Sequence, residues 1–529
     1  MKKNLIIIIV LGSLGAMLGS CSNKLNVVPP NTLTQTQVFS TSLGATEAMA
    51  KVYGAFALTG SGGNSSSDLG GIDAGTSDFV RLLWDASELS TDEAVCAWND
   101  PGVPDFHNMA WSSSNVILLG LYYRSLYQIT VANAFLQGAA GANTKGWTSS
   151  AIDTLHFYVA EARYLRAFQY WELMDLFGNP PFVTEQDPIG AYVPPQITRT
   201  NLFHWVEGEL LSLDSAQALV PARQNLYGRA DQACVWALLA RMYLNADIYL
   251  GSGNDHYTEA ITYATKVINA GYQLMPKYQN LFLADNNTNN TEQILSIQYN
   301  ASTIQNYGGT TFIINAAIGG SMVASNFGLP SGGWAGNRVT SNLPNLFPDL
   351  TGTADKRSMF WTSGQSEAIS DIGDFNDGLA VTKWSNLTSK GQTPAGATTF
   401  ANTNFPLFRV AEDYLIYAEA VLRGGQGGTM TQALTYFNAV RERAYGGASG
   451  DVASFSLQDI LDERGREFYW ECQRRTDLIR FGLFTSESYL WPWKGGVSSG
   501  TGVDDHFNLF PIPATDLESN PNLIQNKDY

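Results

Sequence analysis

The strongest constraint on this 529-residue chain is the repeated helical spacing of its apolar residues. Over 153–177, apolar side chains recur every three or four positions and form one face of a long helix: Leu155, Tyr158, Ala162, Leu165 and Phe168. The pattern ends at Gly178, and prolines follow at 180 and 181. A glycine followed closely by proline is a common helix stop. We therefore expect one long helix that ends at Gly178.

Other helical segments indicate how the helices are arranged. Segments 230–250 and 256–270 share a helical period and are joined by a short turn rich in Gly, Asn and Asp. Two helices joined in this way, with small residues at their crossing, form the unit of tetratricopeptide-like folds. Further helices are predicted over 408–423, 430–444 and 457–481. The sequence therefore predicts an all-α scaffold of tetratricopeptide-like helical pairs.

Long segments with few helix signals separate these helices, over 60–115, 275–405 and 485–525. They are rich in Gly, Asn, Ser and Thr, and loops of this length are usually functional or disordered. Their aromatic content argues against disorder, because they contain Trp84, Trp98, Trp111, Trp334, Trp361 and Trp384. We expect them to form a loop-built binding face on the helical scaffold.

The N-terminus has the features of a secretory signal. Lys2 and Lys3 precede an apolar stretch over 5–18, and small residues then lead to Cys21. This order predicts a lipoprotein signal peptide over 1–20 and an acylated Cys21. The alternative, a plain transmembrane anchor, needs about 20 consecutive apolar residues, which this stretch lacks. Residues 21–36 then form a polar, lipidated tether, and 37–529 are expected to form one folded domain, although length alone would allow two to four domains.

The net charge argues against two classes of partner. The chain carries a formal charge of −17, and removal of residues 1–20 takes away two lysines and no acid, which gives −19. Nucleic acids and anionic headgroups both favour surfaces rich in Lys and Arg. We therefore expect neither as a partner.

The few cysteines predict no disulfide framework. If Cys21 is acylated, only Cys96, Cys234 and Cys472 remain, and three thiols cannot all pair. Cys234 and Cys472 lie in predicted helices among aromatic residues, where a buried free thiol is the ordinary expectation. The chain has no CxxC spacing for zinc.

Motif searches identify no catalytic centre. The five histidines have no HExxH or other metal-ligand spacing, and the chain lacks a P-loop and a dinucleotide fingerprint. Asp92 and Glu93 could in principle act on a sugar as an acid and a base, but 48 acidic residues offer many such pairs. The charged run over 462–475 alternates in sign at helical spacing, which predicts a salt-bridged packing face.

Two loop segments combine aromatic and polar residues in a way that suits sugars. Aromatic rings stack on the flat C–H faces of a sugar, while Asp, Asn and Arg bond neighbouring hydroxyls. Segment 73–111 contains Asp73, Arg81, Trp84, Trp98, Asn99, Asp105 and Trp111, and segment 306–338 contains Asn306, Tyr307, Trp334, Asn337 and Arg338. Composition alone leaves core packing and ligand binding equally open for these aromatics.

A series of motifs resembles the SusD/RagB family of outer-membrane nutrient-binding lipoproteins. In chain order they are 161–166 (EARYLR), 175–181 (DLFGNPP), 228–230 (GRA), 408–415 (FRVAEDYL), 440–444 (VRERA), 463–468 (ERGREF), 477–482 (DLIRFG), 510–513 (FPIP) and 520–526 (NPNLIQN). Further segments resemble the starch-binding branch of this family. They are 69–73 (LGGID), 87–93 (SELSTDE), 97–98 (AW), 306–310 (NYGGT), 333–334 (GW) and 377–384 (DGLAVTKW). The resemblance spans nearly the whole chain after Cys21.

The resemblance implies a binding role and a set of site residues. Trp98, Tyr307 and Trp334 would form an aromatic arc matched to the curvature of an α-1,4-glucan. Asp73, Arg81 and Asn99 would bond its hydroxyls. The family implies an all-helical fold, an outer-membrane position facing the cell exterior, a SusC-type TonB-dependent transporter as partner, and no enzymatic activity. A binding lid for another glycan or for peptides is the alternative.

Two segments depart from the family pattern. Some members bind calcium through a carboxylate-rich stretch, but the corresponding segment here, 285–290, reads DNNTNN and is poor in charge. We therefore expect no cofactor and no metal. Residues 22–24 read SNK, without the acidic residues that often follow the acylated cysteine as a surface-export signal.

Overall fold

A computed structural model describes residues 33–188, 190 and 192–529. The predicted signal peptide, Cys21 and the tether up to residue 32 lie outside the described residues. Within the described part of the chain, no helix combines the length and the apolar character needed to cross a bilayer.

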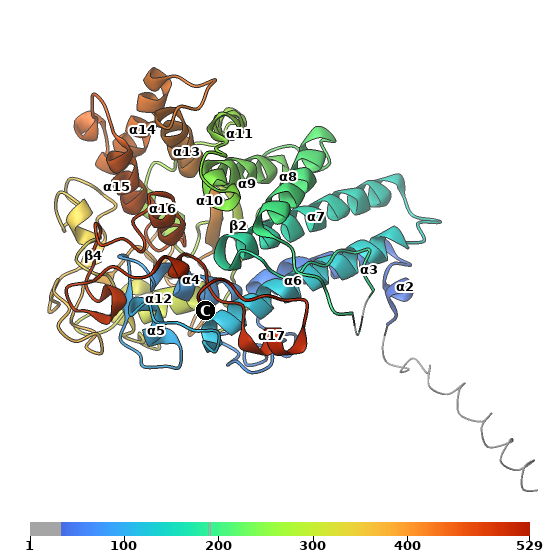
Figure 1. The fold of residues 1–529 in the computed structure, drawn as a ribbon, viewed down its shortest axis with the longest axis horizontal. Helices are drawn as coiled ribbons and strands as arrows, with labels where there is room; N and C mark the ends of the chain where they lie inside the picture. The colour runs from blue at the N-terminus through green and yellow to red at the C-terminus, as the bar shows by residue number, and fades with distance from the viewer. Residues whose placement is uncertain (1–32, 189, 191) are drawn as a thin grey trace, which may run out of the picture.

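The N-terminal third is built around a pair of long helices, α6 (Val116–Ala140) and α7 (Ser149–Phe177), which pack on each other and on α3 (Ser42–Ala57). With the short α2 (Gln35–Val38), their outer ends project to one side of the molecule (Figure 1). The predicted long helix is confirmed as α7. The Thr148 hydroxyl caps its start by accepting from the backbone of Ala151, and Gly178 ends it at φ +72°.

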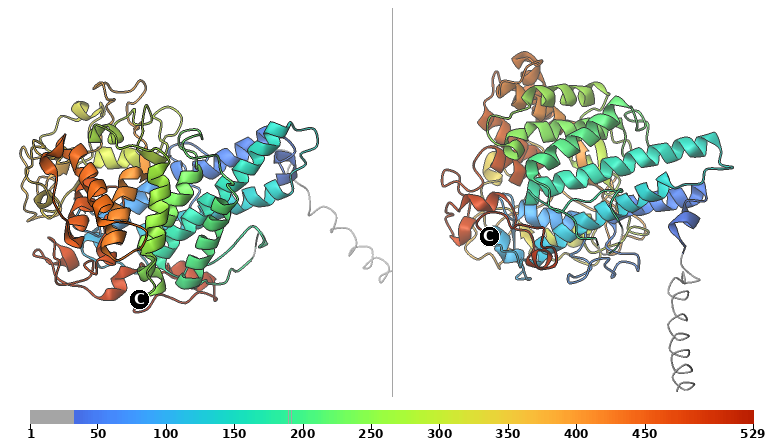
Figure 2. Two further views of the ribbon diagram at one scale, coloured as in Figure 1. Left: turned by 90° about the horizontal axis from the view of Figure 1, so that it is seen from above. Right: turned by 45° about the vertical axis from the view of Figure 1, so that its right-hand side comes forward.

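The remaining long helices follow one another in a stack. They are α8 (Arg199–Ser215), α9 (Gln232–Leu244), α11 (Tyr257–Asn269), α13 (Val410–Leu422) and α14 (Met430–Tyr445). Helix α9 packs on α11, α11 on α13 and α13 on α14, and Figure 2 shows this succession side by side. The predicted helical-pair architecture is therefore confirmed.

Two of the predicted helices are each divided in two. The 230–250 helix breaks at Asn245 into α9 and α10 (Ala246–Leu250), and the 457–481 helix divides into α15 (Leu457–Phe468) and α16 (Arg474–Arg480). At the second break Trp470 and Cys472 adopt φ +63° and +64°. Burial of the indole explains this break, because Trp470 packs on Trp84 with 5.0 Å between ring centroids and donates from Nε1 to the Glu93 carbonyl at 3.0 Å. Tertiary packing here overrides a continuous helical pattern.

The three cysteines that the structure describes are unpaired, as expected, but Cys472 lies in the connection before α16 rather than in a helix. Cys96, Cys234 and Cys472 are free thiols, and the first two are buried. Burial raises the pKa of Cys96 to about 12, so its thiol stays protonated.

The charged run is a packing face, as predicted, but most of its partners lie on other elements. Glu463 and Glu467 of α15 are buried and pair with Arg357, and Glu467 also pairs with Arg409. Burial alone would raise the pKa of Glu467, but Arg443, Arg409 and Arg357 outweigh it and lower this pKa to about 2. The run therefore joins α15 to Arg357 of the loop over 275–405 and to Arg409, and one further bridge, between Arg466 and Glu463, runs along α15 itself.

The long loop segments contain short elements that the sequence did not predict. These are α4 (Phe79–Glu88), β1 (Val95–Cys96), α5 (Val103–His107), β2 (Gln293–Ile297), α12 (Gly309–Ala316), β3 (Asn337–Arg338), β4 (Phe360–Trp361), β5 (Ala380–Val381), β6 (Phe405–Arg409) and α17 (Ala514–Ser519). The strands form three antiparallel pairs, β1 with β3, β2 with β6 and β4 with β5. These pairs join the loop segments to one another, and β6 leads directly into α13.

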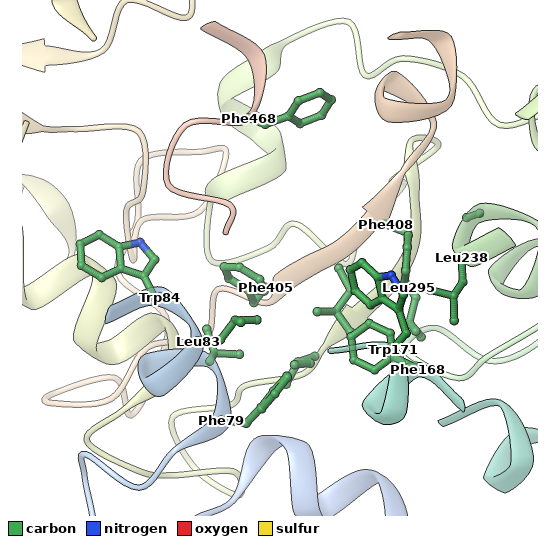
Figure 3. Packing of buried hydrophobic residues seen from close by; sticks show 14 of the residues in the cluster. Phe79, Leu83, Trp84, Phe168, Trp171, Leu238, Leu295, Phe405, Phe408 and Phe468 are labelled. Atoms are coloured by element: carbon green, nitrogen blue, oxygen red, sulfur yellow. The ribbon is translucent and has the colours of Figure 1, made fainter. Parts of the chain in front are cut away.

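The main core joins the loops to the helices. Phe79, Leu83 and Trp84 of α4 lie close to Phe405 of β6, and Phe408 reaches Phe168 of α7 (Figure 3). Of the six loop tryptophans named above, Trp84, Trp111 and Trp384 are buried in this core. The other three, Trp98, Trp334 and Trp361, are half-buried and retain surface for a ligand.

Candidate functional site

One buried carboxylate holds two helix starts together. Asp78 precedes α4, and its Oδ1 accepts from the backbone N–H of Arg81 at 3.0 Å and from that of Gly309 at 2.7 Å, at the start of α12. Its Oδ2 accepts from the side-chain amide of Asn306 at 3.0 Å. Burial raises the pKa of Asp78. This arrangement places Arg81 next to the turn that carries Tyr307.

A short strand pair brings two distant tryptophans together. In the β1–β3 pair, Cys96 lies opposite Asn337, and the N–H of Ala97 continues the pairing by donating to the Gly336 carbonyl at 2.8 Å. Trp98 follows β1, and Trp334 precedes β3. The Trp98 Nε1 donates to the Trp334 carbonyl at 3.2 Å, and the ring centroids lie 6.4 Å apart at 46°. The two indoles therefore form one half-buried aromatic surface.

Phe312 of α12 packs against this aromatic surface from the protein interior. Its ring contacts Trp98 at 6.0 Å between centroids, and the Arg81 guanidinium carbon lies 4.5 Å above its centre. Phe312 is 1% exposed, so it supports the neighbouring side chains and offers no surface to a ligand. No sequence feature indicated this role, because an isolated Phe in an apolar run is typical of a core.

Tyr307 and Asp73 lie together at the start of α12. Tyr307 is 39% exposed, which makes it one of the more open large aromatic side chains among the described residues. A Cβ on Gly75 would lie 2.7 Å from the Cβ of Tyr307 and 3.4 Å from Asp73 Oδ1. Asp73 is exposed, and its Oδ1 accepts from the Thr76 backbone at 3.1 Å. The Asp73 turn and Tyr307 are therefore neighbours across Gly75.

The Arg81 side chain retains unused donor capacity. The side chain is 13% exposed, and its guanidinium donates no hydrogen bond to any described residue, although the Nε itself is buried. Its ion-pair partner, Asp85 Oδ2, lies 3.9 Å away and likewise accepts no hydrogen bond from any described residue. A guanidinium beside aromatic rings with free donors suits neighbouring hydroxyls.

The structure thus brings five of the six predicted residues around α4 and α12: Asp73, Arg81, Trp98, Tyr307 and Trp334. The sixth, Asn99, is exposed and follows Trp98, but its side chain makes no hydrogen bond to any residue that the structure describes. Its place in the site rests on its position beside Trp98.

Other polar residues of the two loop segments are structural. Arg338 is buried and donates to the backbone carbonyls of Asp377, Ile372 and Asp374, so it holds that loop together. Asn306 bonds Asp78, as described above. Neither side chain is available to a ligand.

The acidic pair Asp92 and Glu93 is also structural. Both residues are buried, and Arg474 donates to both oxygens of Asp92 at 2.8 and 2.7 Å. The Tyr489 hydroxyl donates to Asp92 as well, at 2.5 Å. Acid–base chemistry on a sugar needs two carboxyls facing across an open cleft. This pair does not meet that requirement.

The side chains of 285–290, the segment that corresponds to the calcium-binding stretch of some family members, bond within the protein. Both oxygens of Asp285 accept from Ser389, and Asn290 Oδ1 accepts from the backbone of Glu292 and Gln293. Asn286 is buried and bonds Asn404. Across the described ranges, no group of three or more His, Cys, Asp or Glu side chains is arranged to hold a metal ion.

The solved structures of related fold cover nearly the whole chain. A SusD homolog from Bacteroides thetaiotaomicron superposes with a TM-score of 0.74 at 20% identity, over 95% of this chain and 100% of that one. Surface glycan-binding protein A from the same organism, in complex with laminarihexaose, gives 0.69 at 21% identity, over 91% and 98%. At these identities the comparisons establish the fold alone.

Sequence relatives establish the family. The chain is 34% identical to the starch-binding protein SusD of Bacteroides thetaiotaomicron, over 96% of each chain. It is 26% identical to a SusD-like protein of Bacteroides ovatus, over 80% of this chain and 77% of that one. A model of the SusD family also matches residues 234–529. As the motifs predicted, the chain belongs to the SusD family.

Proposed function

We propose that this protein captures starch and related α-1,4-glucans. The observation that carries the proposal is the grouping of Trp98, Tyr307 and Trp334 with Arg81 and Asp73 around α4 and α12. A relative that is 34% identical over 96% of the chain is a starch-binding protein, which supports the same ligand class.

The chemistry of the grouping fits a flexible, curved sugar chain. Three partly exposed rings offer stacking faces for successive glucose units, and weak stacking contacts add up when several are used together. The partly exposed Arg81 guanidinium supplies N–H donors, and the exposed Asp73 supplies acceptors, for pairs of neighbouring hydroxyls. The rings give affinity for glucose, and the polar groups orient it.

The role is binding and not catalysis. The family consists of binding proteins, and this chain belongs to it. The one acidic pair singled out from the sequence, Asp92 and Glu93, is buried against Arg474. Incubation with amylopectin should therefore release no new reducing ends.

We further propose the cellular setting implied by the family. The protein, cleaved after residue 20, is anchored to the outer membrane through acylated Cys21, and residues 21–36 are a tether for a single binding domain over 37–529. It faces the cell exterior and passes glucan to a SusC-like TonB-dependent transporter. Radiolabelled palmitate incorporation that is lost in Cys21→Ala would support the anchor, and co-purification with the transporter would support the partner.

Isothermal titration tests the ligand class. We expect purified protein to bind maltoheptaose and a cyclic maltooligosaccharide, and to bind laminarihexaose, a β-linked glucan, more weakly. Affinity electrophoresis through gels containing different polysaccharides, with a peptide mixture titrated in parallel, tests the alternative ligands. Binding to another glycan or to peptide without binding to α-glucan would contradict the proposal.

A further inference from the structure

Tyr307 is supported differently from the two tryptophans. Trp98 and Trp334 rest on the main core through Phe312. Tyr307 rests on Phe400, with ring centroids 5.0 Å apart at 61°. Phe400 belongs to a small apolar cluster that is separate from the main core and includes Ala301 and Ala397. The exposed ring therefore has its own support.

The Phe400 segment is fastened to α12, the helix that begins just after Tyr307. The N–H of Ala401 donates to the Thr311 hydroxyl at 3.0 Å, and the Thr310 hydroxyl donates to the Thr403 carbonyl at 2.6 Å. Because Thr310 and Thr311 belong to α12, Phe400 and Tyr307 are held in register by the same helix.

The backbone at Gly75 also confines the Cβ of Tyr307. A Cβ at Gly75 would come within 2.7 Å of the Tyr307 Cβ, so the backbone of the Asp73 turn lies directly against the tyrosine. Phe400 is 8% exposed, whereas Tyr307 is 39% exposed. The buried phenylalanine therefore meets the tyrosine ring on one side, and the Gly75 backbone confines its Cβ on another. An edge-to-face contact of this kind favours one ring orientation.

We propose that Phe400 is a positioning residue that fixes the angle of the Tyr307 ring relative to Trp98 and Trp334, and so adapts the aromatic surface to curved α-glucans. This inference rests on the proposed function. Phe400 itself does not touch the ligand. Its loss therefore lowers affinity only through Tyr307, and it lowers affinity most for a rigid, curved ligand that cannot adapt to a misplaced ring.

A double-mutant cycle tests this mechanism by titration with α-cyclodextrin and with maltoheptaose. Phe400→Ala should weaken α-cyclodextrin binding by about 3- to 10-fold, and weaken binding of the linear ligand less. In a Tyr307→Ala background, Phe400→Ala should have no further effect, because the ring that it positions is gone. Phe400→Tyr, which keeps the aromatic edge, should restore most of the affinity.

The controls separate positioning from general damage. Phe455 is also 8% exposed and stacks on Phe437 at 4.6 Å, so Phe455→Ala should lose comparable stability without loss of affinity. Phe400→Leu keeps most of the buried volume and is measured in parallel in case Phe400→Ala does not fold.

Two results would overturn the inference alone: wild-type affinity in a folded Phe400→Ala or Phe400→Leu variant, or an equal loss with and without Tyr307. A wild-type protein that binds none of these glucans would instead overturn the proposed function, and the inference with it.

Discussion

The Asp78 carboxylate accepts a hydrogen bond from the backbone N–H of Gly309 at 2.7 Å, across 231 positions of sequence. The same oxygen accepts from the backbone N–H of Arg81, three residues further along the chain in α4. One side chain therefore joins the starts of α4 and α12, which carry or adjoin most of the site.

Replacing Asp78 should damage stability and binding together. Asp78→Ala leaves the buried N–H groups of Arg81 and Gly309 without an acceptor, which should cost about 2–4 kcal/mol of unfolding free energy. Glucan affinity should fall too, because α4 and α12 lose their common support. Urea unfolding and titration check both effects. Ser456→Ala removes the cap of α15 and should cost about 1 kcal/mol with no change in affinity. Full glucan affinity in Asp78→Ala would contradict this role.

Gly336 should be essential for the placement of Trp98. A Cβ at this position would lie 2.5 Å from two atoms of the Trp98 indole, and the Ala97–Gly336 hydrogen bond leaves the backbone little room to move. Gly336→Ala should therefore displace the indole, weaken glucan binding and change the quenching of tryptophan fluorescence by ligand. Gly208 lies within α8 with open space around its Cβ position, so Gly208→Ala should leave binding unchanged and stabilise by about 0.5–1 kcal/mol. Equal affinity in the two variants would show that Trp98 is placed by other contacts.

Arg81 should bind glucan through the planar N–H donors of its guanidinium and not through charge alone. Arg81→Lys keeps the positive charge but loses bidentate geometry, and we expect glucan affinity to fall about 10-fold. Arg163 pairs with Glu209 near the surface, so Arg163→Lys is the matched control and should bind normally. Titration of both variants decides the point. An unchanged affinity in Arg81→Lys would mean that this side chain serves Asp85 and Phe312 only.

Asp85, beneath the site, should make stability depend on pH. Burial is the main cause that raises its pKa to about 7, with nearby Arg81 opposing this and Asp100 adding to it. In the unfolded chain the pKa of this carboxyl is near 4. Between pH 4 and pH 7 the folded protein therefore keeps a proton that the unfolded chain has lost. The free energy of unfolding falls as pH rises through this range.

Asp85→Asn removes this dependence. The variant should therefore gain stability relative to wild type as pH rises from 4 to 8, by up to about 4 kcal/mol. Urea unfolding at several pH values measures the difference. Parallel stability curves for wild type and Asp85→Asn would mean that Asp85 is not buried in its uncharged form.

The long helices could be predicted from sequence because their determinants are local. The apolar period of α7 and the stop at Gly178 lie within the segment itself. The break between α15 and α16 could not, because it depends on Trp470 packing against Trp84, far away in the sequence. The two-residue strands β1 and β3 were missed for the same reason, since each is defined only by its partner.

The sequence indicated candidate ligand-facing residues but not the residues that support them. Family resemblance identified Trp98, Tyr307 and Trp334, which composition alone could not separate from buried Trp84 and Trp384. Asp78, Phe312 and Phe400 were missed, because buried supports carry no surface chemistry and their contacts are all long-range. The paired glycines at the start of α12, at 308 and 309, were the one local signal of a close approach there.

The central claim is that Trp98 and Trp334 form a glucan-binding surface. Isothermal titration with maltoheptaose should show binding to wild type, and Trp98→Ala and Trp334→Ala should each weaken it by about 10- to 100-fold. Trp147→Ala is the control, because this half-buried tryptophan lies in the α6–α7 connection, at the projecting end of the molecule (Figure 1). Wild-type affinity in both folded site variants, or no binding of maltoheptaose by the wild-type protein, would contradict the claim.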